Sequence, residues 1–347
     1  MHKTHTLADT VSARDALRRL EEVPGPKTLF VLNADERLVG TLTDGDIRRG
    51  LIRGLDVDGP ITEFMFAGFS FLSSVNHNPA EVARLRADDI RLVPLVDEQM
   101  RLLRVIDLVR TRALLPLDAV IMAGGRGERL KPLTDSVPKP LLLVGGKPII
   151  EHNIDRLAAY GLTNITISIR YLGQQLIDHF GDGASRKLNI AYVSEDKPLG
   201  TFGAIKLVEN LHHDAVLVMN SDLLTDIDFE DFYNAFISQG ADMAIATVPY
   251  KVNVPYAVLE VDGTAGIRSF TEKPTYTYYS NAGIYLLRRE LLDRVPTNQH
   301  YNATDLMEDL IAAGRRVVSY PMLGYWLDIG KHDDYRKAQE DIRHLKL

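Results

Sequence analysis

From residue 119 to residue 219 the chain alternates short apolar segments with longer segments of helical spacing. This alternation is typical of an α/β fold, in which a mainly parallel central sheet carries helices on both faces. In such sheets ligands bind beyond the carboxyl ends of the strands. The residues that follow the predicted strands are therefore the first candidates for a site. Strands are predicted at Ala119–Ala123, Ile165–Ile169, Ile190–Val193 and Ala215–Met219, and helices at Ile149–Tyr160, Gln174–Phe180 and Phe202–Leu211.

The first third of the chain reads as two similar units, each with the order helix, strand, strand, helix. A unit of this kind, repeated at about 60 residues, buries its sheet poorly alone, so the two copies should pack together. The predicted elements are Ala13–Glu22, Thr28–Leu32, Leu38–Leu42 and Asp46–Gly50 in the first unit, and Pro79–Arg86, Ile90–Val96, Leu102–Ile106 and a helix opening at Asp107–Arg110 in the second. We therefore predict a small α+β domain over residues 1–113 and a larger α/β domain over residues 118–347.

Composition excludes several functional classes. The net charge is −7, so we expect no nucleic-acid partner and no anionic membrane surface as a partner. The chain has no cysteine, which excludes disulfides and thiolate chemistry. The N-terminal segment has no apolar signal core, and no apolar run approaches the length of a membrane helix. We expect a cytoplasmic protein.

The strongest motif is Ala123-Gly-Gly-Arg-Gly-Glu-Arg-Leu-Lys-Pro-Leu-Thr134, directly after the first predicted strand. Glycines allow backbone N–H groups to approach phosphate oxygens where a side chain would intrude. Arg129, and Lys139 in Val137-Pro-Lys-Pro140, add positive charge for the same phosphates. The glycine spacing does not complete the dinucleotide-binding pattern, and no Gly-Lys-Ser/Thr follows as in a P-loop. The alternative is an ordinary glycine-rich turn between a strand and a helix.

Two aspartates lie in contexts that suit a metal. Asp222 ends the apolar segment Val216-Leu-Val-Met-Asn-Ser-Asp222, and Asp328 lies in Tyr325-Trp-Leu-Asp-Ile-Gly330. A carboxylate at the carboxyl end of a strand is well placed for Mg²⁺, which prefers oxygen ligands and substrate phosphates. Either aspartate alone is more often a helix cap or a turn residue.

From about residue 118 to residue 343 these motifs resemble the sugar-1-phosphate nucleotidyltransferases, a family with a Rossmann-like domain. Further matching segments are Leu199-Gly-Thr-Phe-Gly-Ala204, Phe270-Thr-Glu-Lys-Pro274 and Asn281-Ala-Gly-Ile-Tyr285. The resemblance implies catalytic roles for Arg129, Lys139 and Lys273; nucleotide contacts by Ala123, Gly124, Gly125, Gly127, Glu195, Gly200 and Thr201; sugar contacts by Gly203, Glu272 and Asn281; and Mg²⁺ ligation by Asp222 and Asp328. The aromatic run Tyr276-Thr-Tyr-Tyr279 receives no role.

In the first third, Val39-Gly-Thr-Leu-Thr-Asp-Gly-Asp-Ile-Arg-Arg49 resembles cystathionine-β-synthase-like (CBS) repeats. The resemblance implies a regulatory adenosine nucleotide contacted by Thr43 and Asp46. In the second unit Asp107 is kept, but Arg104 stands where a hydroxyl residue is expected, which argues against a second site. The alternative is a folded dimerisation module without a ligand.

The implied reaction converts an NTP and a sugar 1-phosphate to an NDP-sugar and pyrophosphate, with Mg²⁺, in the synthesis of surface-polysaccharide or glycan precursors. The Leu199–Ala204 segment favours GTP, while thymidylyl or uridylyl transfer stays open. The alternatives are an inactive regulatory subunit and a nucleotide-sensing binding protein. We also expect a homo-oligomer.

Overall fold

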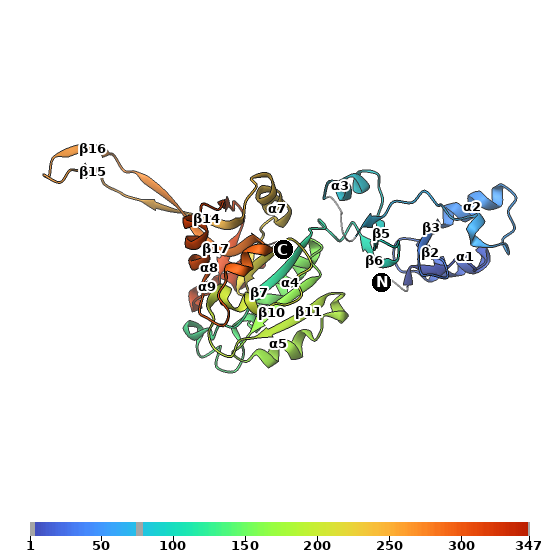
Figure 1. Ribbon diagram of the computed structural model, residues 1–347, viewed down its shortest axis with the longest axis horizontal. Helices are drawn as coiled ribbons and strands as arrows, with labels where there is room; N and C mark the ends of the chain where they lie inside the picture. Colours follow the sequence, from blue (N-terminus) through green and yellow to red (C-terminus); the bar gives the residue numbers. More distant parts are fainter. Residues whose placement is uncertain (1–3, 74–78, 346–347) are drawn as a thin grey trace. The chain divides into compact units, whose positions relative to one another are not determined.

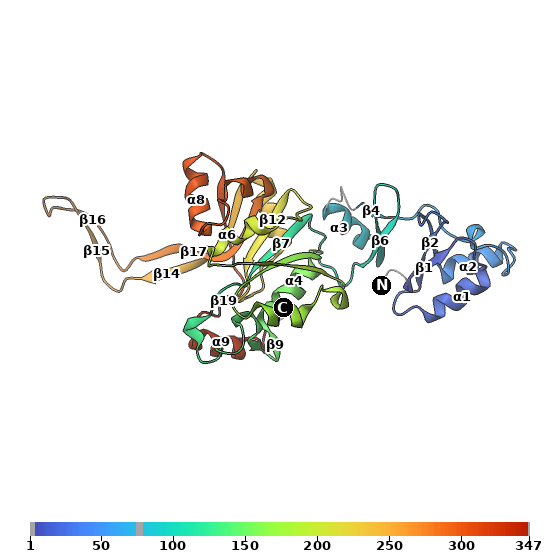
Figure 2. The same cartoon turned by 60° about the horizontal axis from the view of Figure 1, so that its bottom comes forward.

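The computed structural model describes residues 4–73 and 79–345. The chain divides into two compact units, Met1–Leu114 and Leu115–Leu347 (Figures 1 and 2). Within the described ranges, no helix is both long enough and apolar enough to span a bilayer.

The second unit is built on a seven-stranded sheet with the order β11-β10-β7-β12-β17-β14-β18 (Figure 1). Six strands run in the same direction, and β17 runs against them between β12 and β14. This confirms the expected mainly parallel sheet. The strands are β7 (Leu117–Met122), β10 (Asn164–Ile169), β11 (Asn189–Ser194), β12 (Ala215–Asn220), β14 (Met243–Asn253), β17 (Thr275–Arg288) and β18 (Val317–Pro321).

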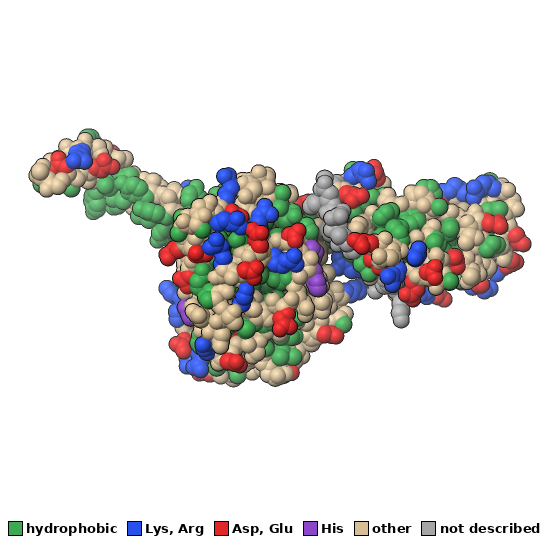
Figure 3. All heavy atoms as spheres, viewed as in Figure 1, with side chains coloured by type: hydrophobic (Ala, Val, Ile, Leu, Met, Phe, Trp, Pro, Cys, Tyr) green, Lys and Arg blue, Asp and Glu red, His purple; other side chains and the backbone are tan. Residues whose placement is uncertain are grey.

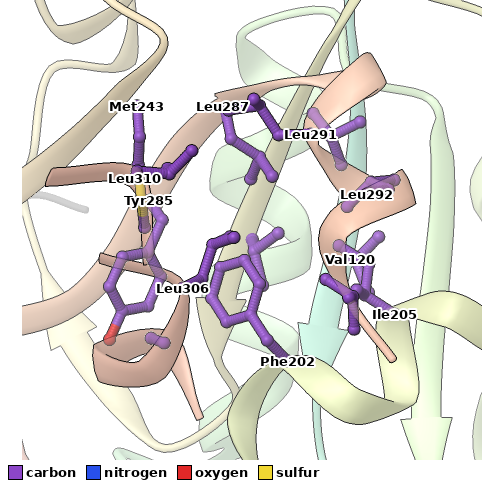
Figure 4. Packing of buried hydrophobic residues seen from close by; sticks show 14 of the residues in the cluster. Val120, Phe202, Ile205, Met243, Tyr285, Leu287, Leu291, Leu292, Leu306 and Leu310 are labelled. Atoms are coloured by element: carbon purple, nitrogen blue, oxygen red, sulfur yellow. The ribbon is translucent and has the colours of Figure 1, made fainter. Parts of the chain in front are cut away.

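Helices cover this sheet and bury its apolar side chains. On one face Val120, Val218 and Tyr285 pack against helices α6 and α8, and Phe202 meets the Tyr285 ring edge-on at 5.3 Å (Figure 4). The helix predicted over 202–211 is shorter than expected, because the chain becomes extended at Val208. The helices are α4 (Ile149–Ala159), α5 (Gly173–Phe180), α6 (Gly200–Gly203), continued as a 3₁₀ turn (Ala204–Leu207), α7 (Phe229–Ser238), α8 (Ala303–Ala312) and α9 (His332–Asp341).

The first unit contains two three-stranded sheets of identical topology, in which a parallel pair is followed by an antiparallel pair. In each antiparallel pair the register repeats at a constant offset of 64 residues, so Thr28 faces Thr43 as Leu92 faces Asp107. The elements are β1 (Thr6–Ala8), α1 (Ala13–Glu22), β2 (Thr28–Leu32), β3 (Leu38–Thr43) and α2 (Asp44–Ile52), then β4 (Leu72–Ser73), α3 (Pro79–Ala87), β5 (Leu92–Val96) and β6 (Leu102–Asp107).

The two repeats pack together as expected. Arg37 forms a β-bridge with Arg101, its own counterpart in the other repeat. A shared core joins Phe30 and Leu38 of the first repeat to Val105 of the second. Equivalent positions that meet each other indicate a local two-fold relation between the repeats.

The structure corrects two details of the second repeat. Asp107 corresponds to Thr43, and Arg104 corresponds to Gly40, so Arg104 does not replace a ligand-binding hydroxyl. No helix opens at Asp107, where residues 108–110 form a turn instead. In the first repeat Thr43 begins α2 with a capping box. Among the described residues of the second repeat there is no such reciprocal cap at Asp107, whose Oδ1 accepts from the Val109 N–H and whose Oδ2 accepts from Arg91.

Strands β14 and β17 continue their pairing beyond the sheet to form a long ribbon (Figures 1 and 2). A β-bulge between Ile245 and Thr247 separates the part of this pairing within the sheet from the part beyond it. Past the bulge, the two strands stay paired as far as Asn253 and Thr275. A hairpin of β15 (Val258–Val261) and β16 (Ile267–Thr271) forms the tip. We call residues 248–280 the arm.

Candidate active site

The carboxyl ends of β7, β10, β11 and β12 surround a cleft of about 550 Å³. Its position follows from the parallel sheet, because loops that leave neighbouring strands at one edge leave a crevice between them. Ten of the residues expected in a site line it, namely Ala123, Gly124, Gly125, Gly127, Arg129, Lys139, Glu195, Gly200, Thr201 and Asp222.

The glycine loop lies close to other parts of the cleft at some positions and is open at others. A Cβ atom on Gly124 would stand 2.5 Å from Oε1 of Glu195, so a side chain does not fit there. Gly125 has no atom within 4 Å of such a Cβ and faces open space. Gly127 has a φ of 64°, and its carbonyl accepts a hydrogen bond from Thr134 Oγ1 at 2.9 Å, which closes the loop. The loop thus presents backbone to the cleft, as phosphate binding requires.

Glu195 is buried and links strand β10 to the segment that precedes α6. Its Oε1 accepts a hydrogen bond from Ser168 Oγ at 2.6 Å, and its Oε2 accepts one from the backbone N–H of Leu199 at 3.0 Å. Both carboxylate oxygens are therefore occupied by the protein. This geometry supports a positioning role for Glu195 and leaves the expected direct nucleotide contact a prediction.

Lys139 and two aspartates form the charged centre of the site. The ammonium of Lys139 makes an ion pair with Asp222 and stands 3.8 Å from Oδ1 of Asp328. The aspartates are 106 positions apart in sequence, and the pairing of β13 (Leu223–Thr225) with β19 (Trp326–Asp328) brings them together. Burial raises the pKa of Asp328, and the charge of Asp222 raises it further, while Lys139 and Arg129 act in the opposite direction.

These two carboxylates fit a magnesium ion. Asp328 Oδ1 is buried and has no hydrogen-bond partner among the residues that the structure describes, which leaves a lone pair available for a cation. Across residues 4–73 and 79–345 no cluster of three or more metal-ligating side chains occurs. Mg²⁺ commonly uses only one or two carboxylates and takes its other ligands from water and substrate phosphates. The donor set therefore suits Mg²⁺ held together with a nucleotide.

The loop that carries Asp222 is held by helix α4. Asn153 is buried, and its Nδ2 donates to the carbonyl of Leu223 at 2.9 Å and to the carbonyl of Ser221 at 3.3 Å. These two carbonyls flank Asp222 on either side. Asn153 thus fixes the backbone from which the aspartate side chain reaches the cleft.

Two of the expected residues lie far from this cleft. Glu272 and Lys273 are exposed between β16 and β17, beyond the end of the β14–β17 pairing and eight or more residues before Asn281. At about 3.3 Å per residue this distance is roughly 25 Å. The structure does not bring this pair to the chain's own cleft, because β14 and β17 stay paired instead of folding back.

Gly203 and Asn281 also lie outside the lining. A Cβ atom on Gly203 would stand 2.5 Å from the carbonyl of Gln299, so this buried glycine has no room for a sugar. Asn281 is exposed, and its Oδ1 accepts from the N–H of Gly283 at 2.9 Å. Gly283 packs against Asn220 of the cleft, so Asn281 lies near the rim and its sugar contact stays a prediction.

Among the lining residues that were not predicted as site residues, Arg170, His300 and Asn302 lie outside every motif that the sequence offered. Arg170 follows β10 directly, so the rule of strand ends would have found it. Nothing in the sequence marks His300 and Asn302, which arrive with the segment before α8. That segment is held by hydrogen bonds of Tyr301 to the backbone of Leu199 and Phe202.

In the first unit Thr43 and Asp46 bind each other. Thr43 Oγ1 donates to Asp46 Oδ2 at 2.6 Å, and Asp46 also pairs with Arg49. These contacts form the N-terminal cap of α2. A pocket of about 540 Å³ lies beside Asp46 and Phe64. An adenosine nucleotide at this place stays a prediction, as does the CBS identity of the repeats.

Comparison with known proteins identifies the family of the second unit. The family model described as nucleotidyl transferase matches residues 118–344. A mannose-1-phosphate guanylyltransferase of Mycobacterium tuberculosis is 32% identical over 231 residues, covering 65% of this chain and 64% of that protein. A UTP–glucose-1-phosphate uridylyltransferase of Synechocystis is 30% identical, covering 64% of this chain and 62% of that protein. The chain thus spans slightly less than two thirds of these relatives.

Solved structures of similar proteins have the same fold as the second unit. The crystal structure of HddC from Yersinia pseudotuberculosis matches with a TM-score of 0.52 and 28% identity, over 65% of this chain and 99% of that chain. A structure titled as a glucose-1-phosphate thymidylyltransferase of Bacillus anthracis, at 24% identity and a TM-score of 0.54, shares the fold. The matched family model covers almost the whole unit that carries the cleft, and the chain therefore belongs to the nucleotidyl transferase family.

Proposed function

We propose that the chain transfers a nucleotidyl group from a nucleoside triphosphate to a sugar 1-phosphate and releases pyrophosphate. The observation that carries the proposal is the pair of Lys139 and Asp222 in a cleft lined by bare glycine backbone, with Asp328, which is not itself a lining residue, 3.8 Å from Lys139. Such a site can hold a polyphosphate and a divalent cation together. The named relatives, which act on mannose 1-phosphate and glucose 1-phosphate, support the sugar-phosphate substrate.

In the proposed reaction an oxygen of the sugar phosphate attacks the α-phosphorus of the NTP. A new P–O bond forms as the bond to the β-phosphate oxygen breaks, and pyrophosphate leaves with that electron pair. A phosphate monoester has a second pKa near ~6, so the nucleophile is already an anion at neutral pH and no general base is needed. The chain's task is to position two polyanions and to offset their repulsion.

Each part of the cleft has a role in this task. Backbone N–H groups of the glycine loop bind phosphate oxygens, and Lys139 and Arg129 contribute positive charge. Asp222 and Asp328 would hold Mg²⁺, which supplies Lewis-acid stabilisation of the phosphate charge when bound. Asn153 keeps the aspartate loop in place, and Glu195 links β10 to the segment before α6 directly beside Gly124.

We further propose that GTP is the preferred nucleotide. The Leu199-Gly-Thr-Phe-Gly-Ala204 segment supports this choice, and so do the guanylyltransferases among the relatives and the HddC structure titled as a complex with GMP-PN. A pocket built for guanine leaves polar groups unpaired around a pyrimidine, at a cost of about 1–3 kcal/mol for each group.

A matrix of GTP, dTTP, UTP and CTP against hexose and heptose 1-phosphates, monitored by pyrophosphate release, tests both proposals. We expect kcat/KM for GTP to exceed that for each pyrimidine nucleotide by about tenfold or more. The Asp222→Asn variant is the blank that excludes contaminating enzymes. A tenfold pyrimidine preference would overturn the choice of GTP, and no turnover with any pair would overturn the transferase proposal.

A further inference from the structure

The arm has no hydrophobic core of its own. It consists of two strands throughout, first β14 with β17 and then β15 with β16. Every residue of β16 is exposed, as are the first seven residues of β17. Two-stranded ribbons without packing on a further layer are marginally stable in water. The arm therefore gains most of its stability if something covers it.

The tip of the arm is amphipathic. Residues directly opposite in an antiparallel pair point to the same face, and successive residues alternate between faces. Leu259 therefore shares one face with its partner Phe270, and Val261 shares that face with Ile267. These four side chains are between 51% and 67% exposed. The opposite face is more polar: it carries the hydrogen bond from Ser269 to Glu260 and the pair of Val258 with Thr271.

The ribbon between the tip and the sheet adds aromatic surface. Tyr250 faces Tyr278, and Val252 faces Tyr276, all four on one side. Nine of the twenty large hydrophobic side chains that are exposed among the described residues lie on this arm, which is less than a tenth of the chain. Figure 3 shows this gathering as a band of hydrophobic atoms along the arm. The nine lie on both sides of the arm, since Tyr279 pairs with Pro249 and faces away from Tyr278. The four side chains of the tip expose on the order of 400 Å², about half of the ~800 Å² per partner of a stable interface, so the unpaired strand edges must contribute the rest.

Charge on the arm favours a copy of the chain as the covering partner. The arm contains three acidic residues (Glu260, Asp262, Glu272) and three basic residues (Lys251, Arg268, Lys273), so its net charge is zero. The whole chain has a net charge of −7, so two copies repel each other elsewhere and meet most easily at the arm. A lipid surface fits less well, because the arm has no excess of basic residues.

The geometry also suits a symmetric contact. Both strands of the tip have a free edge, and an antiparallel ribbon can pair with an identical ribbon across a two-fold axis. We propose that the arms of two copies associate through the face formed by Leu259, Val261, Ile267 and Phe270, and that this contact holds the protein as a dimer. The inference is independent of the transferase activity.

Sedimentation and light scattering on the full chain test the proposal. We expect the wild type to be a dimer at micromolar concentration. Phe270→Asp places a carboxylate in the apolar contact of each arm and should raise the dimer dissociation constant by about a hundredfold or more. Thr271→Asp is the matched control, since it adds the same charge one residue away on the polar face and should leave the dimer intact. Both positions are exposed, so circular dichroism and Tm should match the wild type.

A cross-linking experiment gives a second readout. The chain has no cysteine, so Ile267→Cys introduces a single thiol on the proposed contact face. A short bis-maleimide should join two copies of this variant, and Ile311→Cys, similarly exposed on α8, should stay uncross-linked. A monomeric wild type would overturn the proposal, whether its arm is covered by another part of the chain or binds lipid vesicles. A Phe270→Asp protein that remains a dimer would also overturn it, because another surface would then hold the copies together.

Discussion

The carboxyl edge of the sheet and the arm both carry residues that the sequence assigns to one site, yet only the edge brings its residues together. At the edge, strand ends and the loops after them meet because the parallel strands β7, β10, β11 and β12 end side by side. On the arm, Glu272 and Lys273 follow the course of an antiparallel ribbon, whose length the local motif does not determine. A motif at the end of a parallel strand therefore predicts a position in space, whereas a motif within a long hairpin does not.

The largest effect should come from the charged centre at the edge. Asp222→Asn keeps the shape of the side chain but removes one of the two carboxylates beside Lys139, so turnover should fall by about a hundredfold or more. The measurement is kcat at saturating Mg²⁺ and NTP. Tm should change little, because the amide oxygen can still accept from Lys139, which also stays 3.8 Å from Asp328. A variant with nearly the wild-type rate would remove Asp222 from the site.

Two neighbouring glycines should separate ligand binding from stability. Gly125 faces open space, so Gly125→Val should weaken NTP binding by about tenfold or more while Tm stays unchanged, since the new side chain occupies the place of phosphate oxygens. Calorimetric titration with NTP measures this effect.

Gly124→Ala is the companion variant. Its methyl group would meet the Glu195 carboxylate at 2.5 Å, so the protein should lose about 1–3 kcal/mol of stability and show a lower Tm. If Gly125→Val binds NTP as tightly as the wild type, the loop does not hold phosphate.

The smallest effect should come from the arm. Lys273→Ala should lower kcat/KM by less than about threefold, because the residue is roughly 25 Å along the ribbon from the rim of its own cleft. A loss of tenfold or more would mean that the arm reaches a cleft during turnover. Mixing the Lys139→Ala and Lys273→Ala variants would then show which cleft the arm reaches. Activity recovers only if the intact arm of one copy contributes Lys273 to the intact cleft of the other copy.

The strand ends explain how much of the site could be predicted. The glycine loop and Asp222 follow apolar strands directly, and the same rule extends to Arg170. The contact between Asp222 and Asp328 depends on the pairing of β13 with β19, two three-residue strands too short to stand out in sequence. His300 and Asn302 depend on tertiary packing between α6 and α8, which has no local signal.

The fold was predictable where the spacing of hydrophobic residues matches the element that forms. Examples are the mainly parallel sheet and the helix Ala13–Glu22 of the first unit. The fold was not predictable where a strand pattern continues from the sheet into a segment that lies outside it. β17 has strand-forming residues on both sides of Asn281, with Tyr276, Tyr278 and Tyr279 before it and the apolar run over residues 282–287 after it. The pattern therefore predicts a strand in both halves but does not show that the first half leaves the sheet. The helix expected at Asp107 fails for a different reason, the lack of a reciprocal cap like the one between Thr43 and Asp46.

The shared core of the two repeats has a consequence for biosynthesis. Phe30 and Leu38 are covered by Leu102 and Val105, which are made more than 60 residues later. During translation the first sheet must therefore wait, with an apolar face in water, until its counterpart leaves the ribosome. A ribosome that pauses between the repeats would hold a nascent chain prone to aggregation, so synonymous codon changes across residues 50–90 should alter the yield of this protein without altering its sequence.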